Sequence, residues 1–221
     1  MASERDAKLA SSARRAAERL GLAATWSVSG EPVDVENDFL YELYVLLRLV
    51  RALRETYKVR FVPGEGTWEY KFPAKPATKV GKPRFTVLDR ETRESVAQLC
   101  AGTEIFDATG KTRAPDISFQ KPDAPDHPTH QDTTMIWDAK YRKGGGRITG
   151  PEFSHFARWV ELLGVRTSPP PSIDLGPLAA MAGNCLVTNG SESTETDGER
   201  TNRCVKEAAG FKPHYSPKIR P

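Results

Sequence analysis

The clearest candidates for chemistry in this chain are an acid and a base in the stretch TTMIWDAKYR, residues 133–142. The stretch has the pattern of an apolar β-strand, and side chains alternate between the two faces of a strand. Asp138 and Lys140 therefore point to the same side. A carboxylate and an ammonium group buried side by side form either a structural ion pair or part of an active site. The strand alone leaves both interpretations open.

A second carboxylate belongs to the segment APDISFQ, residues 114–120, which also has the pattern of a strand. Pro115 and Asp116 stand near its beginning, where proline does least harm to a strand. Residues 121–132 are rich in turn-forming residues and predict a loop that joins two antiparallel strands. Such a hairpin places the start of the first strand beside the end of the second, so Asp116 meets Asp138 and Lys140.

A third carboxylate, Glu42, lies in the segment with the strongest helical pattern, residues 38–57. Glu42 falls within the apolar arc of this helix, where an ionised carboxylate is costly unless it is paired, hydrogen-bonded or bound to a metal. We expect the helix to cover the face of the hairpin that carries Asp138. A buried glutamate satisfied by an arginine or a backbone group is the alternative. The apolar arc contains Phe39, Leu46, Leu49, Val50 and Leu53.

Carboxylates gathered in one place repel each other unless a cation neutralises them. Oxygen ligands suit Mg²⁺ or Mn²⁺, and Mg²⁺ takes one or two protein carboxylates together with waters and phosphate oxygens. Such an ion polarises a phosphodiester and lowers the pKa of a bound water. Lys140 would orient or deprotonate the attacking water and offset charge on the phosphorus. The cluster therefore favours phosphodiester hydrolysis.

The order of a glutamate, Pro-Asp and Asp-x-Lys resembles the PD-(D/E)xK nuclease superfamily. Pro115 and Asp116 match the first motif, and Asp138 to Lys140 match the second. The resemblance covers roughly residues 38–163, the size of one domain. The segment DAKYR is similar to that of prokaryotic restriction and defence nucleases such as McrC-like proteins. The resemblance implies an α/β fold with a restriction-endonuclease-like core, in which helices flank a central mixed β-sheet.

The resemblance also implies a role for each motif residue. Asp116, Asp138, the Ala139 carbonyl and Glu42 would ligate Mg²⁺ or Mn²⁺, and Lys140 would be the catalytic lysine. The implied activity is that of a metal-dependent endonuclease, with DNA favoured over RNA, in a restriction or phage-defence system. The alternative is an inactive nuclease fold that binds nucleic acid or assembles a complex. Other candidates for the third carboxylate are Glu36, Asp38 and Glu104.

Basic and aromatic residues follow the catalytic strand directly and predict contacts with nucleic acid phosphates at the rim of the site. A solvated surface is the alternative for each of them. An HxxH pair, His127 and His130, lies in the loop between the hairpin strands, but without a second ligand pair it is a poor indication of zinc. The predicted nucleic-acid contacts are Tyr141, Arg142, Lys143 and Arg147.

The bulk composition is that of an ordinary globular protein, with 221 residues, 38% hydrophobic and 28% charged, and a net charge of +3. This charge permits a polyanionic partner without requiring one. Three cysteines without CxxC spacing indicate neither a disulfide framework nor a zinc ribbon. The lack of a long apolar run or a secretory signal predicts a cytoplasmic protein without a membrane partner. A homodimer, or a separate targeting or ATPase subunit, is the expected protein partner.

The remaining sequence predicts the elements that must position these residues. We expect strands at residues 58–62, 67–72, 84–89 and 183–189, a strand or short helix at 97–106, and a helix at 151–163. The Lys- and Pro-rich residues 73–83 predict a solvated loop, and the polar residues 190–203 predict a mobile segment. The expected organisation is an N-terminal helical extension at residues 1–30, a nuclease-like core at 31–165, and a C-terminal strand with an irregular, partly flexible tail of the same domain at 166–221.

Overall fold

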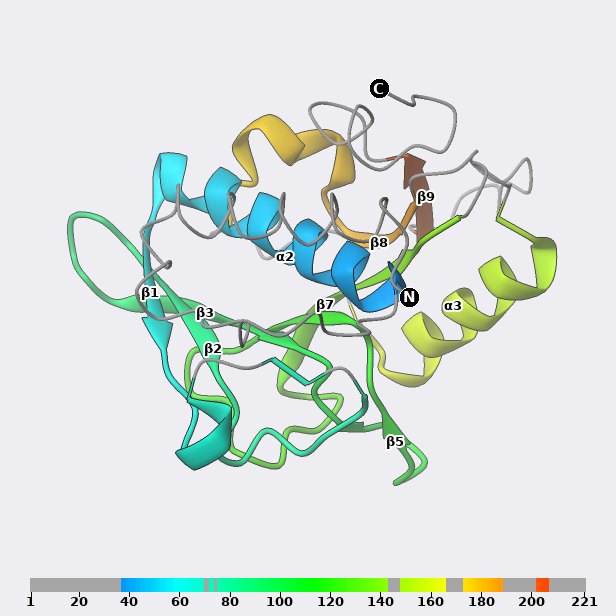
Figure 1. Cartoon of the computed structure of the whole chain (residues 1–221), viewed down its shortest axis with the longest axis horizontal. Helices are drawn as coiled ribbons and strands as arrows, with labels where there is room; N and C mark the ends of the chain where they lie inside the picture. The colour runs from blue at the N-terminus through cyan, green and yellow to red at the C-terminus, as the bar shows by residue number, and fades with distance from the viewer. Residues whose placement is uncertain are drawn as a thin grey trace, which may run out of the picture.

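The computed structural model of the protein describes residues 37–69, 72–73, 75–142, 148–165, 173–188 and 202–206. The predicted N-terminal helix and Glu36 lie outside these ranges. Within them, the chain is an α/β protein in which helices flank a seven-stranded mixed sheet (Figure 1). None of the helices in this part of the chain is long and apolar enough to cross a membrane. In spatial order, the strands are β1 (Lys58–Val62), β2 (Arg84–Leu88), β3 (Ser95–Ala101), β6 (Ile117–Gln120), β7 (Thr133–Lys140), β8 (Asn184–Thr188) and β9 (Asn202–Lys206).

The sheet changes direction at β7. Neighbouring strands from β1 to β7 run antiparallel, whereas β7, β8 and β9 run parallel to one another. Parallel neighbours need a crossover connection, and helix α3 (Gly150–Leu162) supplies part of the connection between β7 and β8. Residues 202 and 203 belong to β9, so the prediction of a mobile segment at residues 190–203 is wrong for its last two residues. Both strands after residue 166 extend the same sheet as the hairpin.

Helix α2 (Asn37–Thr56) confirms the helix predicted at residues 38–57 and lies across one face of the sheet (Figure 1). It packs on Met135, Trp137 and Ala139, which occupy alternate positions of β7. The expectation that this helix covers the face of Asp138 is therefore wrong, because alternation turns Asp138 toward the opposite face. The helix is buried on nearly all sides, since the short helix η3 (Gly176–Met181) packs on it as well.

Helix α3 confirms the helix predicted at residues 151–163 and covers part of the other face. Its start is a capping box, in which the Thr149 side chain accepts from the Glu152 N–H and the Glu152 side chain accepts from the Thr149 N–H. Phe153, Phe156 and other buried side chains of the helix pack in a second core cluster with Ile136 of β7. β7 is thus buried on both faces.

Two predicted segments take a different form. The predicted strand at residues 67–72 is wrong at its start, because residues 67 and 68 belong to the short 3-10 helix η2 (Gly66–Trp68), which begins at a glycine with a φ of 55°. Residues 97–106 form parts of two strands, β3 and β4 (Ile105–Phe106), and β4 pairs with β5 (Thr112–Arg113). The break between β3 and β4 is Gly102, whose φ is 58°. A positive φ is readily adopted by glycine and ends a strand locally.

The loop at residues 73–83 is only partly solvated. Lys79 is 2% exposed, and its ammonium group donates to the carbonyls of Ala124 at 2.8 Å and Pro125 at 3.1 Å. Burial lowers the pKa of Lys79 below its ordinary value. The prediction of a wholly solvated basic loop is therefore wrong at this position, because the loop between β6 and β7 covers the side chain.

Candidate active site

The predicted hairpin is formed by β6 and β7, and its register brings the two aspartates together. Ile117 is paired with Trp137, so Asp116, the residue before β6, lies next to Asp138. The Ala139 N–H donates to Oδ2 of Asp116 at 2.6 Å. This bond ties the Asp116 carboxylate to the middle of the Asp138–Lys140 motif.

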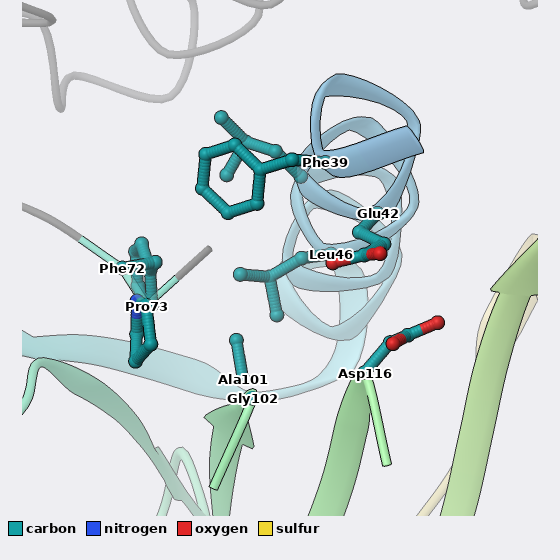
Figure 2. Close-up of a pocket in the computed structure, with 9 residues that line it drawn as sticks. Phe39, Glu42, Leu46, Phe72, Pro73, Ala101, Gly102 and Asp116 are labelled. Atoms are coloured by element: carbon teal, nitrogen blue, oxygen red, sulfur yellow. The ribbon is translucent and has the colours of Figure 1, made fainter. Parts of the chain in front are cut away.

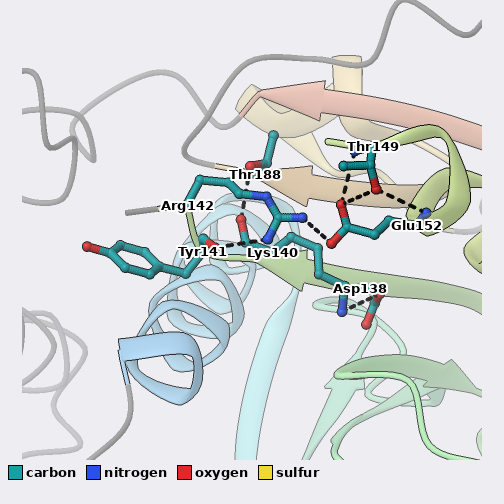
Figure 3. A network of polar contacts seen from close by, with 7 residues as sticks. All are labelled: Asp138, Lys140, Tyr141, Arg142, Thr149, Glu152 and Thr188. Atoms are coloured by element: carbon teal, nitrogen blue, oxygen red, sulfur yellow. Dashed lines mark hydrogen bonds and ion pairs between the residues drawn. The ribbon is translucent and has the colours of Figure 1, made fainter. Parts of the chain in front are cut away.

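Lys140 forms an ion pair with Asp138, with 2.7 Å between Nζ and Oδ2 (Figure 3). Both side chains are shielded from water, Asp138 more than Lys140. Burial alone would lower the pKa of Lys140, but the charges of Asp138 and Asp116 raise it above its ordinary value. The ammonium group therefore keeps its proton at neutral pH in this arrangement.

The surroundings of Asp116 disfavour the ionised form of its carboxyl group. Removal from water raises its pKa well above the ordinary value, and the charges of Asp138 and Glu42 raise it further. Lys140 acts in the opposite direction but does not outweigh them. The three carboxylates predicted from the sequence are thus electrostatic neighbours, although they come from three separate elements.

Glu42 reaches this neighbourhood from α2, at the edge of a small cleft that Asp116 also lines. Figure 2 shows Glu42 and Asp116 on the same side of the cleft, with Phe39, Leu46 and Phe72 on the apolar side. Glu42 approaches at the end of the strands, and this explains how a helix on the opposite face of β7 still brings it near Asp116. Glu42 is thus near Asp116, as predicted, although α2 does not cover the predicted face of the sheet.

Two of the other candidates for the third carboxylate, Asp38 and Glu104, lie elsewhere. Asp38 is exposed in the first turn of α2, and Glu104 is half-buried between β3 and β4, where its N–H donates to the Ala77 carbonyl. Glu36 lies outside the described residues. Of Asp38, Glu104 and Glu42, Glu42 is the one whose charge acts on the pKa of both Asp116 and Lys140.

The donor set suits a hard divalent cation, because it consists of carboxylate oxygens with a backbone carbonyl beside them. Mg²⁺ takes one or two protein carboxylates and completes its shell with waters and substrate oxygens, so Asp116 and Asp138 could hold it. Among the described residues, no set of three or more His, Cys, Asp and Glu side chains is arranged to hold a metal ion.

The residues predicted to contact nucleic acid are only partly described. Lys143 and Arg147 lie outside the described ranges. Tyr141 is 7% exposed, and its ring lies 6.3 Å from that of Tyr41, centroid to centroid. Arg142 forms an ion pair with Glu152 of α3 (Figure 3). Their contact with nucleic acid stays a prediction.

Two side chains of β8 support β7 and were missed by sequence reasoning. The Thr188 hydroxyl donates to the Lys140 carbonyl at 2.9 Å, and the Asn184 side chain accepts from the Ile136 N–H at 3.0 Å. In each of these two hydrogen bonds, the two bonded residues are 48 positions apart in the chain. A polar residue at each end of the apolar strand NCLVT is the one local signal of such a role.

No family model, curated protein or solved structure matches this chain. What the site can do chemically is therefore inferred from its own side chains. Two adjacent aspartates, a third acid and a protonated lysine meet at one end of the sheet beside a small cleft. This set can bind a divalent cation and can neutralise negative charge on a bound phosphate.

Proposed function

We propose that the protein is a divalent-metal-dependent endonuclease of the PD-(D/E)xK superfamily, with a restriction-endonuclease-like core, which hydrolyses phosphodiester bonds in DNA. The observation that supports it most is the register of β6 and β7, by which Asp116 binds the Ala139 N–H beside Asp138 and Lys140. The hairpin predicted from the sequence led us to expect this meeting of residues. The similarity of DAKYR to defence nucleases extends the proposal to a restriction or phage-defence system.

Each residue has a defined part in this proposal. Asp116, Asp138 and the Ala139 carbonyl would hold Mg²⁺ or Mn²⁺, with Glu42 as the accessory acid. When bound, the ion supplies Lewis-acid activation of the phosphodiester and of a water nucleophile. Lys140, which pairs with Asp138 at 2.7 Å, would orient or deprotonate the attacking water and offset negative charge developing on the phosphate.

The Asp138–Lys140 ion pair also favours a second candidate. At 2.7 Å, the ammonium group occupies an oxygen of Asp138 that a metal ion would share or take over. A nuclease fold that keeps this pair as a purely structural contact would bind nucleic acid or assemble a complex without catalysis. Metal-dependent cleavage distinguishes the two candidates.

The test is cleavage of plasmid and linear DNA with Mg²⁺ or Mn²⁺ by the wild type and by Asp138→Ala and Lys140→Ala. We expect cleavage by the wild type and a loss of about 100-fold or more in each variant, typical of removing a group that stabilises the transition state. The exposed Lys121 of the hairpin loop provides a matched control as Lys121→Ala, which should cleave normally. An RNA substrate of the same sequence tests the preference for DNA.

Activity that survives both substitutions would contradict the assignment. Binding of DNA without hydrolysis and without a need for metal would support the inactive nuclease fold. Calorimetry that detects no binding of Mn²⁺, together with no cleavage, would leave Asp138 and Lys140 as a structural ion pair.

A further inference from the structure

The C-terminal end of the catalytic strand is held by contacts from two other elements (Figure 3). From β8, the Thr188 hydroxyl donates to the carbonyl of Lys140, the last residue of β7. Two residues later, the Arg142 guanidinium donates to the Tyr141 carbonyl at 3.2 Å and also pairs with Glu152 of α3. The backbone on both sides of the Lys140–Tyr141 junction is thus tied to the rest of the fold.

Glu152 is a fixed anchor for Arg142. Its carboxylate accepts the Thr149 N–H at 3.0 Å and the Thr149 hydroxyl at 2.8 Å, within the capping box that begins α3. Partial burial alone would raise the pKa of Glu152, but the bonds from Thr149 and Arg142 lower it to about 2. Glu152 is therefore an anion at neutral pH, at a helix N-terminus where negative charge is favoured.

Arg142 itself is poorly placed for a phosphate. Its side chain is 22% exposed, and its guanidinium is engaged by both a carbonyl and a carboxylate. Glu152, whose own position is fixed by three bonds with Thr149, already takes part of the guanidinium that a DNA phosphate would contact. The contacts of Arg142 thus point inward, to the strand and helix that it joins.

We infer that Arg142 is a positioning residue, which together with Glu152 ties the end of the catalytic strand to α3 and thereby keeps Lys140 on Asp138. The inference rests on the proposed nuclease function and replaces the predicted phosphate contact of Arg142. Without the Arg142–Glu152 ion pair, the C-terminal end of β7 becomes more mobile, and the Lys140 ammonium group is no longer held in one position. A displacement of about 1 Å at reacting groups can lower a rate by about 100-fold.

The phosphate contact and the positioning role predict different kinetics. Loss of a phosphate contact weakens DNA binding, raises KM and lowers the slope of log affinity against log salt by about 1. Loss of a positioning contact lowers kcat and leaves KM and the salt slope unchanged. Glu152 separates the two roles most sharply, because it touches Arg142 but carries the wrong charge for a phosphate.

The experiment measures kcat, KM and the salt slope of DNA cleavage for Glu152→Gln, Arg142→Gln and the double variant. Glutamine also completes a capping box, so Glu152→Gln keeps the start of α3 intact. We expect kcat to fall about 10-fold or more in each single variant, with KM unchanged and the double variant no worse than the worse single one. The matched control is Arg158→Gln, which breaks the exposed Arg158–Glu161 pair on the same helix and should have no effect.

An unchanged kcat in Glu152→Gln, or a raised KM and reduced salt slope in Arg142→Gln, would overturn the inference. If the wild type does not cleave DNA, the proposed function fails, but the tie is still tested by the urea midpoints of the same variants. Shifts of the two single variants that add up in the double variant would then show that Arg142 and Glu152 act independently.

Discussion

Replacing Asp116 with asparagine should make the metal-free protein more stable while it abolishes cleavage. Asparagine keeps the size of the side chain and an oxygen that can accept the Ala139 N–H, which now donates to Asp116 at 2.6 Å. It removes a carboxylate whose pKa is raised by loss of water and by the charges of Asp138 and Glu42. The repulsion within the cluster should therefore fall without loss of the bond that orders the site.

The size of the effect follows from the charges involved. Single changes that relieve an unfavourable site commonly stabilise by about 0.5–2 kcal/mol. For a chain of this length, about 1 kcal/mol raises Tm by about 2–4 °C. The gain should depend on pH, because a carboxyl group with a raised folded-state pKa costs stability once it must ionise. The advantage of Asp116→Asn is thus smallest below the ordinary aspartate pKa, grows as the pH rises toward the folded-state pKa of Asp116, and then levels off.

The assay is urea unfolding in the presence of a chelator between pH 4 and pH 8, repeated with Mg²⁺. The matched control is Asp123→Asn, at an exposed aspartate of the hairpin loop, which should behave as the wild type. Mg²⁺ should stabilise the wild type, by about 2.7 kcal/mol at a concentration of 100 Kd, and should stabilise Asp116→Asn far less.

A lower stability of Asp116→Asn than of the wild type at pH 8 without metal would contradict this prediction. A difference between the two proteins that stayed constant across the pH range would show that the pKa of Asp116 is not raised in the folded state. Equal stabilisation of both proteins by Mg²⁺ would place the metal elsewhere.

Two further predictions concern the segments that flank the site. Lys79→Met should lower the free energy of unfolding in urea by about 1–3 kcal/mol, because it removes the ammonium donor from the buried Ala124 carbonyl and the part-buried Pro125 carbonyl, whereas the exposed Lys75→Met should change it little. Gly102→Ala should lower Tm more than Gly110→Ala, since both glycines have positive φ but a Cβ at Gly102 would lie 3.2 Å from the Pro73 carbonyl oxygen and one at Gly110 would meet nothing within 4 Å. Equal losses at the two glycines would mean that the segment at Pro73 does not constrain the turn.

Local patterns predicted the elements that carry the site. The apolar arc of α2, the buried stripe of α3 and the alternation along β7 each follow from a repeat of a few residues, and the observed bounds differ from the predicted ones by one or two residues. Failures came where a single glycine decided the backbone. Gly66 and Gly102, with φ of 55° and 58°, turn the start of a predicted strand into a 3-10 helix and a predicted continuous segment into two strands.

The meeting of Asp116 with Asp138 and Lys140 was determined by the sequence itself, because an antiparallel hairpin joins segments that are close in the chain and alternation sets the side of each residue. The face that α2 covers, the burial of Lys79 and the bonds of Lys140 and Arg142 to Thr188 and Glu152 were decided only in the tertiary structure. Each depends on which distant surface packs against which, and no local periodicity encodes that choice.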